Sequence, residues 1–151
     1  MLFQNCSSSK IDTQNTEPLR ITQFKDLDSL LIEEPKPIAI FIHTDWCKYC
    51  KNMAQTTFKN QAVINTLNEN FYFISFNGES KDDIEFNNQT YKYQPSGRSS
   101  GIHKLAIEIG MVDGEVSYPT FVVLDPNYEI LFQYNAFLSG LEMLDVLNRF
   151  L

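Results

Sequence analysis

The chain contains four apolar runs of strand length, and these runs predict a central sheet. Residues 38–42 (Ile-Ala-Ile-Phe-Ile) and 71–76 (Phe-Tyr-Phe-Ile-Ser-Phe) are almost continuously apolar, which is typical of strands that are buried on both faces and usually parallel. A third run covers 120–124, and turn residues at 125–128 connect it to a fourth run at 130–134. This last pair predicts an antiparallel hairpin.

Between the runs, apolar residues recur every three to four positions and predict amphipathic helices. In chain order, these segments lie at 19–32, 47–59, 62–68, 102–109 and 139–151. Ser139 followed by Glu142 predicts a capping box at the start of the last helix. The helices between the first two runs predict a right-handed β-α-β crossover with parallel strands. Residues 78–101 are irregular and predict a loop with a short hairpin.

Composition and charge narrow the class of protein. Of 151 residues, 43% are hydrophobic and 21% are charged, which is ordinary for one soluble globular domain. The formal net charge is −7 without any basic cluster, so we expect no nucleic-acid partner. No run of about 18 apolar residues occurs, so we expect no membrane span. Residues 1–18 are polar and aperiodic, which predicts a flexible tail or linker before one domain over 19–151.

The three cysteines carry the first chemical signal. Cys47 and Cys50 form a C-x-x-C pair, whereas Cys6 lies in the tail. The two histidines of the chain do not complete the usual zinc ligand sets, so we expect neither a metal nor a cofactor. The pair directly follows a buried strand and opens a helix, where free N–H groups and the helix dipole stabilise a thiolate. We therefore expect Cys47 to point toward solvent and attack a disulfide, and the more buried Cys50 to resolve the mixed disulfide.

A second motif lies just before the third strand. Pro119 directly precedes the 120–124 run. Proline does not fit inside a central strand, so Pro119 is expected to mark the start of this strand. An X–Pro bond in such a turn is also where a cis peptide is found at small cost. Together, residues 38–51, which contain Asp-Trp-Cys-Lys-Tyr-Cys-Lys, and residues 118–125 resemble the thioredoxin superfamily, with the same element order over about 19–151.

This resemblance implies a fold and a site. The fold is an α/β thioredoxin-like three-layer α/β/α sandwich, whose central mixed sheet has about four to five strands and an insertion before the cis-Pro strand. Pro119 is then cis and faces the disulfide, and its neighbouring backbone pairs with a substrate strand. The supporting or substrate-binding residues are Trp46, Lys48, Tyr49, Tyr118 and Pro119.

The sequence around the pair is similar to thioredoxin-like domains of bacterial envelope thiol-disulfide reductases. The function implied is a thiol–disulfide oxidoreductase for protein or peptide disulfides, re-reduced by an upstream electron-donor thiol protein. Trp46 and Lys51 favour the reducing direction. The alternative is a non-catalytic binding or scaffold domain whose C-x-x-C is a structural disulfide or metal clip. An intact pair together with Pro119 argues against it, since such a module needs neither.

Two departures from the superfamily pattern leave open questions. Many thioredoxins carry an acidic residue six positions before the first cysteine, where this chain has Phe41. His43, Asp45 and Lys51 are nearby titratable alternatives, and the sequence assigns none of them as the proton acceptor for the buried thiol. The second departure is the extra length at 78–101. Its aromatic residues either pack a satellite core, which we favour, or cap the active site.

The compartment depends on the N-terminal segment. Residues 2–9 resemble the end of a lipoprotein signal that leads into a lipid-bearing cysteine, here Cys6. This favours an extracytoplasmic location, in the periplasm or cell envelope, with a lipid anchor at Cys6 as the expected membrane contact. The alternative is a cytoplasmic protein in which Cys6 is a stray thiol outside the redox cycle.

Overall fold

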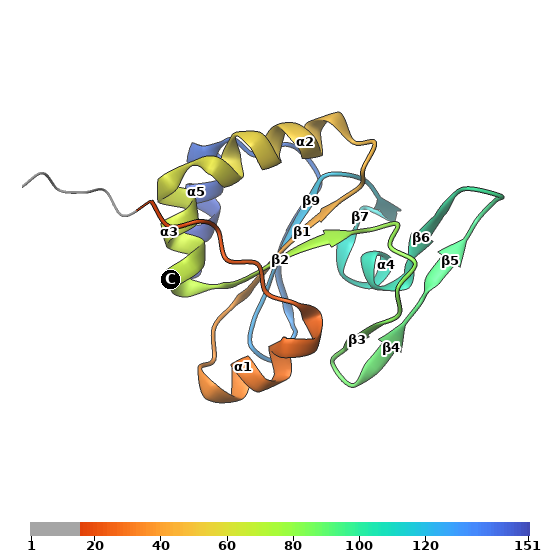
Figure 1. Ribbon diagram of the computed structural model, residues 1–151, viewed down its shortest axis with the longest axis horizontal. Helices are drawn as coiled ribbons and strands as arrows, with labels where there is room; N and C mark the ends of the chain where they lie inside the picture. The colour runs from red at the N-terminus through yellow and green to blue at the C-terminus, as the bar shows by residue number, and fades with distance from the viewer. Residues whose placement is uncertain (1–15) are drawn as a thin grey trace, which may run out of the picture.

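A mixed four-stranded sheet forms the centre of the molecule in the computed structural model, which describes residues 16–151 (Figure 1). The strand order is β10-β9-β1-β2. β1 runs parallel to β2 and antiparallel to β9, and β9 pairs antiparallel with β10. The four predicted strands are confirmed, as β1 (Ile38–His43), β2 (Tyr72–Asn77), β9 (Thr120–Leu124) and β10 (Ile130–Tyr134).

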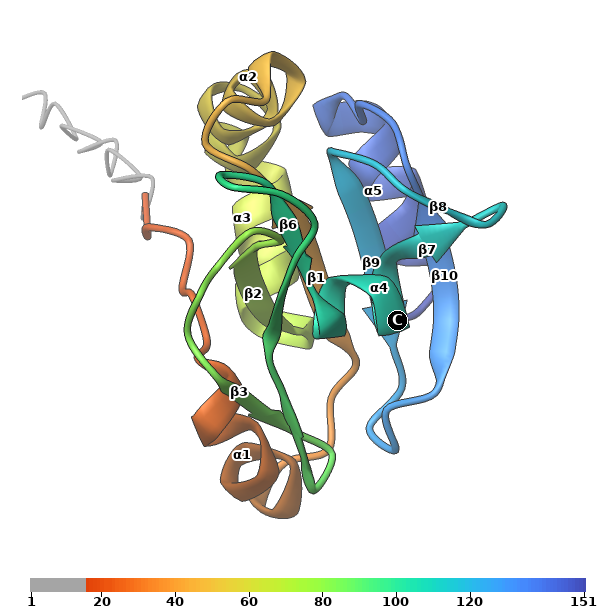
Figure 2. The same cartoon turned by 90° about the vertical axis from the view of Figure 1, so that its right-hand side faces the viewer.

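Helices cover both faces of this sheet and give the predicted three-layer sandwich (Figures 1 and 2). One face carries α2 (Lys48–Gln55), α3 (Gln61–Asn70) and α5 (Gly140–Asn148). The other face carries α1 (Leu27–Glu33) and α4 (Lys104–Gly110). Short 3-10 helices lie before α1, at Phe24–Asp26, and after α2, at Thr57–Lys59. No helix within residues 16–151 is both long and apolar enough to cross a membrane.

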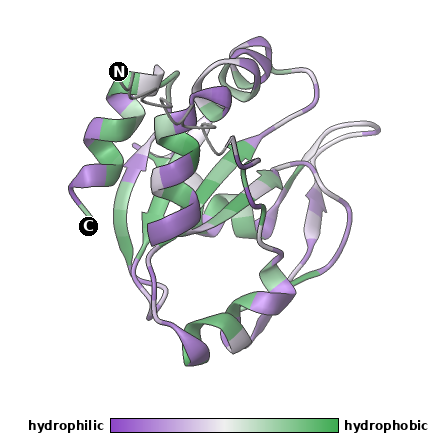
Figure 3. Cartoon of the chain, turned by 60° about the vertical axis from the view of Figure 1, so that its left-hand side comes forward, coloured by the Kyte–Doolittle hydropathy of each residue, from purple (hydrophilic) through white to green (hydrophobic). Residues whose placement is uncertain are grey.

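The continuous apolar runs follow from this double covering. Ala39 and Phe41 of β1 pack into the core cluster beneath α2, α3 and α5, whereas Ile38, Ile40 and Ile42 pack into the cluster beneath α1 and α4. Successive side chains of a strand point to opposite faces, so a strand between two helical layers needs apolar residues at every position. Figure 3 shows the hydrophobic colour concentrated on the inner strands, while the helices carry both colours.

The N-terminal segment differs from the predicted helix over 19–32. The chain lies outside helix up to Gln23, and α1 itself begins only at Leu27. The backbone N–H of Thr22 donates to the carbonyl of Phe73 at 2.7 Å, and Leu19 packs on the cluster beneath α2, α3 and α5. Only the part of the predicted segment from residue 24 onward is helical, because the contacts of residues 19–23 outweigh their local helix propensity.

Polar side chains cap the starts of α3 and α5. At α5 the predicted capping box is present: the Glu142 N–H donates to the Ser139 hydroxyl at 3.3 Å, and the Ser139 N–H donates to the Glu142 carboxylate at 2.8 Å. At α3 the Asn60 side chain accepts the backbone N–H groups of Ala62 and Val63. These caps satisfy donors that a helix leaves free at its first turn.

Small hairpins replace the predicted loop at 78–101 and continue beyond it. They are β3–β4 (Ile84–Phe86, Gln89–Tyr91), β5–β6 (Tyr93–Pro95, Gly101–His103) and an unpredicted third, β7–β8 (Met111–Val112, Glu115–Val116). Phe86 of β3 packs edge-on against Phe24 and Tyr128, with ring centroids 5.7 and 4.8 Å apart. The aromatic residues of the β3–β4 hairpin therefore extend the core beneath α1, as the favoured interpretation predicted.

Candidate active site

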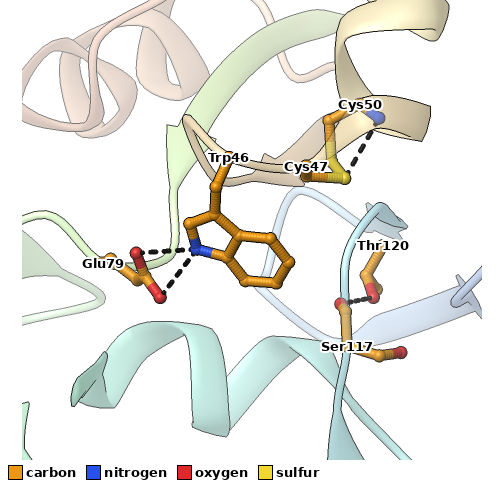
Figure 4. Close-up of a disulfide and its surroundings, with 6 residues drawn as sticks. All are labelled: Trp46, Cys47, Cys50, Glu79, Ser117 and Thr120. Carbon is orange, nitrogen blue, oxygen red and sulfur yellow. Dashed lines mark hydrogen bonds between the residues drawn. A yellow bond between two sulfur atoms is a disulfide. The ribbon is translucent and has the colours of Figure 1, made fainter. Parts of the chain in front are cut away.

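The C-x-x-C pair forms a disulfide at the start of α2 (Figure 4). Cys47 is the N-cap residue of this helix, with extended backbone angles, and its sulfur accepts the backbone N–H of Cys50 at 3.1 Å. The Cα atoms of the two cysteines are 5.2 Å apart. A sulfur in the N-cap position faces the free N–H groups of the first turn, which stabilise negative charge there once the disulfide opens.

The two cysteines do not differ in exposure as predicted. Cys47 is 4% exposed and Cys50 is 3% exposed, and both belong to the cluster beneath α2, α3 and α5. The expectation of a solvent-directed Cys47 is wrong for this disulfide-bonded form, because the bond holds both sulfurs at the edge of the core. What distinguishes them is electrostatic, since the Cys47 sulfur receives the backbone N–H of the first turn.

Trp46 stands beside the disulfide at the surface. It is 65% exposed, and its indole N–H donates to both carboxylate oxygens of Glu79, at 3.2 and 3.1 Å (Figure 4). The indole also contacts the ring of Tyr118 edge-on, with centroids 6.1 Å apart. The contacts with Glu79 and Tyr118 hold a large aromatic surface next to the reactive pair while leaving most of it open to solvent.

The loop before β9 lies across from the disulfide. Figure 4 shows Ser117 and Thr120 on the side that faces the two cysteines, and the Thr120 hydroxyl donates to the Ser117 carbonyl at 2.7 Å. Between them, Pro119 is buried and the Tyr118–Pro119 peptide bond is cis. The two sequence motifs, far apart in the chain, therefore meet at one end of the sheet.

Tyr118 fills the space between Trp46 and the end of β2. A Cβ atom at Gly78 would lie 2.5 Å from Cε1 of the Tyr118 ring, so this close approach requires glycine. The phenol oxygen is buried and has no hydrogen-bond partner among residues 16–151. Burial, with a smaller contribution from the charge of Glu79, raises the pKa of Tyr118 to about 12. The phenol is thus neutral and offers apolar surface to the site.

Gly78 and Glu79 are site residues that the sequence interpretation missed. They follow β2 directly, and β1 and β2 are parallel neighbours, so the residues after each strand meet at the same end of the sheet. The backbone N–H of Gly78 donates to the carbonyl of His43 at 2.8 Å, which fixes this junction. The signal that could have found them is their position immediately after the second buried strand.

Lys48 and Tyr49, between the cysteines, are both exposed on the first turn of α2, and Tyr49 is 66% exposed. Trp46 and Tyr49 therefore present two aromatic side chains to solvent on either side of Cys47 along the chain. Among residues 16–151, no group of three or more His, Cys, Asp or Glu side chains is arranged to hold a metal ion.

A pocket of about 350 Å³ opens on the Cys50 side of the pair. It gathers the three titratable alternatives that the sequence left unassigned, His43, Asp45 and Lys51, together with Cys50. Phe41, which occupies the position of the missing acid, is buried and stacks on His43 with centroids 5.2 Å apart. Burial lowers the pKa of His43, and the charge of Asp45 partly opposes that shift.

Comparison with known proteins agrees with this fold. The sequence model of the thioredoxin-like domain family matches residues 24–151, so the chain belongs to that family. The chain is also similar to the thiol:disulfide interchange protein DsbD of Pectobacterium atrosepticum, at 36% identity over 47 residues. That match covers 31% of this chain and only 8% of the length of that protein.

Solved structures share the same fold at low sequence identity. An oxidoreductase named DsbH superposes with a TM-score of 0.65 and 13% identity, over 98% of this chain and 93% of its own. A thioredoxin from Thermus thermophilus superposes with a TM-score of 0.61 and 18% identity, over 88% of this chain and 87% of its own. The reduced C-terminal domain of DsbD from Neisseria meningitidis superposes with a TM-score of 0.56 and 19% identity, over 84% of this chain and 92% of its own. A thioredoxin-like domain with adjacent paired cysteines supports the class of thiol–disulfide oxidoreductase.

Proposed function

We propose that this protein reduces protein disulfides through a Cys47–Cys50 dithiol. The observation that carries the proposal is the Cys47 sulfur at the start of α2, where it accepts the Cys50 N–H beside an exposed aromatic surface. A disulfide with a purely structural role needs neither a helix N-terminus at one sulfur nor aromatic side chains left open to solvent next to it.

The reaction proceeds by two thiol–disulfide exchanges. The Cys47 thiolate attacks one sulfur of the substrate disulfide, and the other substrate sulfur leaves as a thiolate. Cys50 then attacks Cys47, the Cys47–substrate bond breaks, and the second substrate sulfur leaves. The substrate gains two electrons and two protons, and the protein retains the disulfide. An upstream thiol protein reverses this oxidation and returns the protein to its dithiol form.

The surface around the pair is suited to an extended peptide. Trp46 and Tyr49 are exposed next to the paired cysteines in the chain. The loop from Ser117 to Thr120, which contains Tyr118 and Pro119, lies across from the disulfide. Backbone groups of this loop would pair with the substrate strand, as in recognition by strand addition. The aromatic rings would then contact the side chains that flank the substrate disulfide, and Lys48 adds a positive charge at the rim.

We further propose an extracytoplasmic location with a lipid anchor at Cys6. The support is the resemblance of residues 2–9 to the end of a lipoprotein signal. Cys6 lies outside the residues that the structure describes. Incorporation of radiolabelled palmitate into the wild-type chain, and its loss in Cys6→Ser, tests the anchor independently of the redox chemistry.

The function is tested by insulin reduction with dithiothreitol as electron donor. We expect Cys47→Ser to abolish turnover, whereas the matched substitution Cys6→Ser leaves it unchanged, because Cys47 bears the attacking sulfur. A folded wild-type protein without turnover would support the non-catalytic alternative. Faster oxidation of a reduced peptide than reduction of insulin would contradict the proposed direction.

A further inference from the structure

Resolution of the mixed disulfide requires a base that the usual position does not supply. Cys50 is 3% exposed and packs in the apolar cluster. Burial in such surroundings raises the pKa of a thiol, and only the thiolate attacks a disulfide. The side chain of Phe41 lies against Phe58 and His43 and carries no acceptor. Some other group must take the proton of Cys50 when it attacks Cys47.

We propose that His43, across the pocket that it shares with Cys50, accepts the proton of the Cys50 thiol during resolution of the mixed disulfide. This inference rests on the proposed oxidoreductase function. His43 is the last residue of β1, and its side chain lies on the same side of the sheet as α2, stacked on Phe41. The pocket's volume of about 350 Å³ has room for water molecules that would connect the imidazole with the thiol.

The Ser75 hydroxyl positions the imidazole. His43 Nε2 and Ser75 Oγ are 3.0 Å apart, across the parallel strands β1 and β2. When Nε2–H donates to this hydroxyl, Nδ1 retains its lone pair and is the nitrogen able to take a proton. Burial lowers the pKa of His43, so the ring is neutral near neutral pH and free to accept.

The other polar groups that face the pocket are less suited to this role. The Lys51 ammonium on α2 is a donor without a lone pair. Asp45 is exposed and accepts a long hydrogen bond from the Asn77 side chain at 3.4 Å. Its negative charge favours the imidazolium form of His43, so it would stabilise the product of the proton transfer. The Thr44 and Ser75 hydroxyls are too weakly basic to hold a proton from a thiol.

The step balances within the protein and its substrate. The proton moves from Cys50 Sγ to His43, and the Cys50 thiolate forms a bond to Cys47 Sγ. The bond between Cys47 and the substrate sulfur breaks, and its electron pair leaves with that sulfur. The imidazolium then returns a proton through the pocket water to the departing thiolate or to solvent, so that His43 ends neutral.

The test follows the two exchanges separately. The reduced protein is mixed with DTNB in a stopped-flow instrument, where each exchange releases one coloured thiolate. We expect His43→Gln to leave the first release within about twofold of wild type and to slow the second about a hundredfold near neutral pH, the low end of what a positioned base contributes. Asp45→Asn is the matched control, and we expect it to slow the second release far less.

A pH profile of the wild-type protein keeps the proposal testable if His43→Gln does not fold. The rate of the second release should fall at acid pH with a midpoint below 6.5, the ordinary value for histidine, because burial lowers the pKa of His43. A profile that rises only through the thiol range, an unchanged second release in folded His43→Gln, or a larger effect of Asp45→Asn would overturn the assignment. Absence of any second release from wild-type protein would instead contradict the proposed function itself.

Discussion

Single side chains set the surface around the disulfide. Trp46 is held in place by the Glu79 carboxylate and by the edge of Tyr118, and Tyr118 in turn fits because residue 78 is a glycine. A substitution at any one of these residues would therefore change the position of Trp46 beside Cys47, because each of them contacts another member of the group. The group links the residues that follow two adjacent strands, β1 and β2, with the loop that precedes β9.

The phenol of Tyr118, which has no hydrogen-bond partner within residues 16–151, leads to a prediction about stability. We expect Tyr118→Phe to raise the free energy of unfolding by about 1 kcal/mol, because it removes a buried hydroxyl that gains no hydrogen bond from the described part of the chain on folding. The matched substitution Tyr72→Phe should lower it by about 1 kcal/mol, since that hydroxyl donates toward the carbonyls of Leu30 and Glu34 at 3.1 and 2.8 Å. Urea unfolding of both variants measures the contrast, and equal losses would contradict it.

At the scale of elements, the starts of the helices position the reactive cysteine and the helices that support it. α2 places the Cys47 sulfur at its first turn, and α3 and α5 begin at the side-chain caps of Asn60 and Ser139. α5 packs on α3, and both lie in the layer that supports α2. The caps therefore stabilise the layer beneath the active site without touching the reactive pair.

Removal of one cap separates stability from chemistry. We expect Ser139→Ala to lower the free energy of unfolding by about 1 kcal/mol, because it removes the oxygen that accepts the Glu142 N–H. The reaction of the folded protein with DTNB should not change. Ser99→Ala, an exposed loop position, is the control and should change neither quantity. A slower DTNB reaction in folded Ser139→Ala would show that α5 influences the site directly.

At the scale of the whole molecule, His103 connects the segment before β3 with the start of α4 through hydrogen bonds of its buried ring. It is fully buried, its Nδ1 accepts the Leu105 N–H at the start of α4, and its Nε2 lies 3.0 Å from the Asp82 carbonyl. These two contacts require the neutral tautomer that carries its proton on Nε2. Burial lowers the pKa of His103, with smaller opposing contributions from the Asp82 carbonyl and the charges of Asp83 and Asp82.

The stability of the protein should therefore depend on pH in the range where histidine titrates. The unfolded chain binds protons at His103 with the ordinary pKa of 6.5, and the folded chain binds them only at lower pH. The contribution of His103 to the free energy of unfolding is therefore fully present above pH 6.5, and it is lost as the pH drops below that value. His43 has a shift of the same sign and adds to the loss.

The contribution of His103 is isolated by His103→Asn. Asparagine also accepts an N–H at a helix start and donates through its amide, but it does not titrate. We expect urea unfolding at several pH values to show a shallower loss of stability just below pH 6.5 in this variant than in wild type. Identical pH dependence in the two proteins would show that His103 does not contribute.

The sequence by itself determined the strands, most of the helices and the position of the reactive pair. Continuous apolar runs, the 3.6-residue period and the Ser139 cap are local signals, and the elements that depended on them are present, except that the first predicted helix is shorter than its apolar period. The C-x-x-C pair at the end of β1 and the proline before β9 were enough to predict the fold family, because both are short motifs tied to strand ends.

Only the tertiary structure decided what surrounds that pair. Residues 19–23 lie outside helix and Thr22 bonds to β2, and Cys47 and Cys50 are equally buried in the disulfide. Glu79 reaches Trp46, and His43 shares a pocket with Cys50, because β1 and β2 lie side by side and α2 covers their ends. Such contacts join residues that are far apart in the chain, and the period of a single segment carries no information about them.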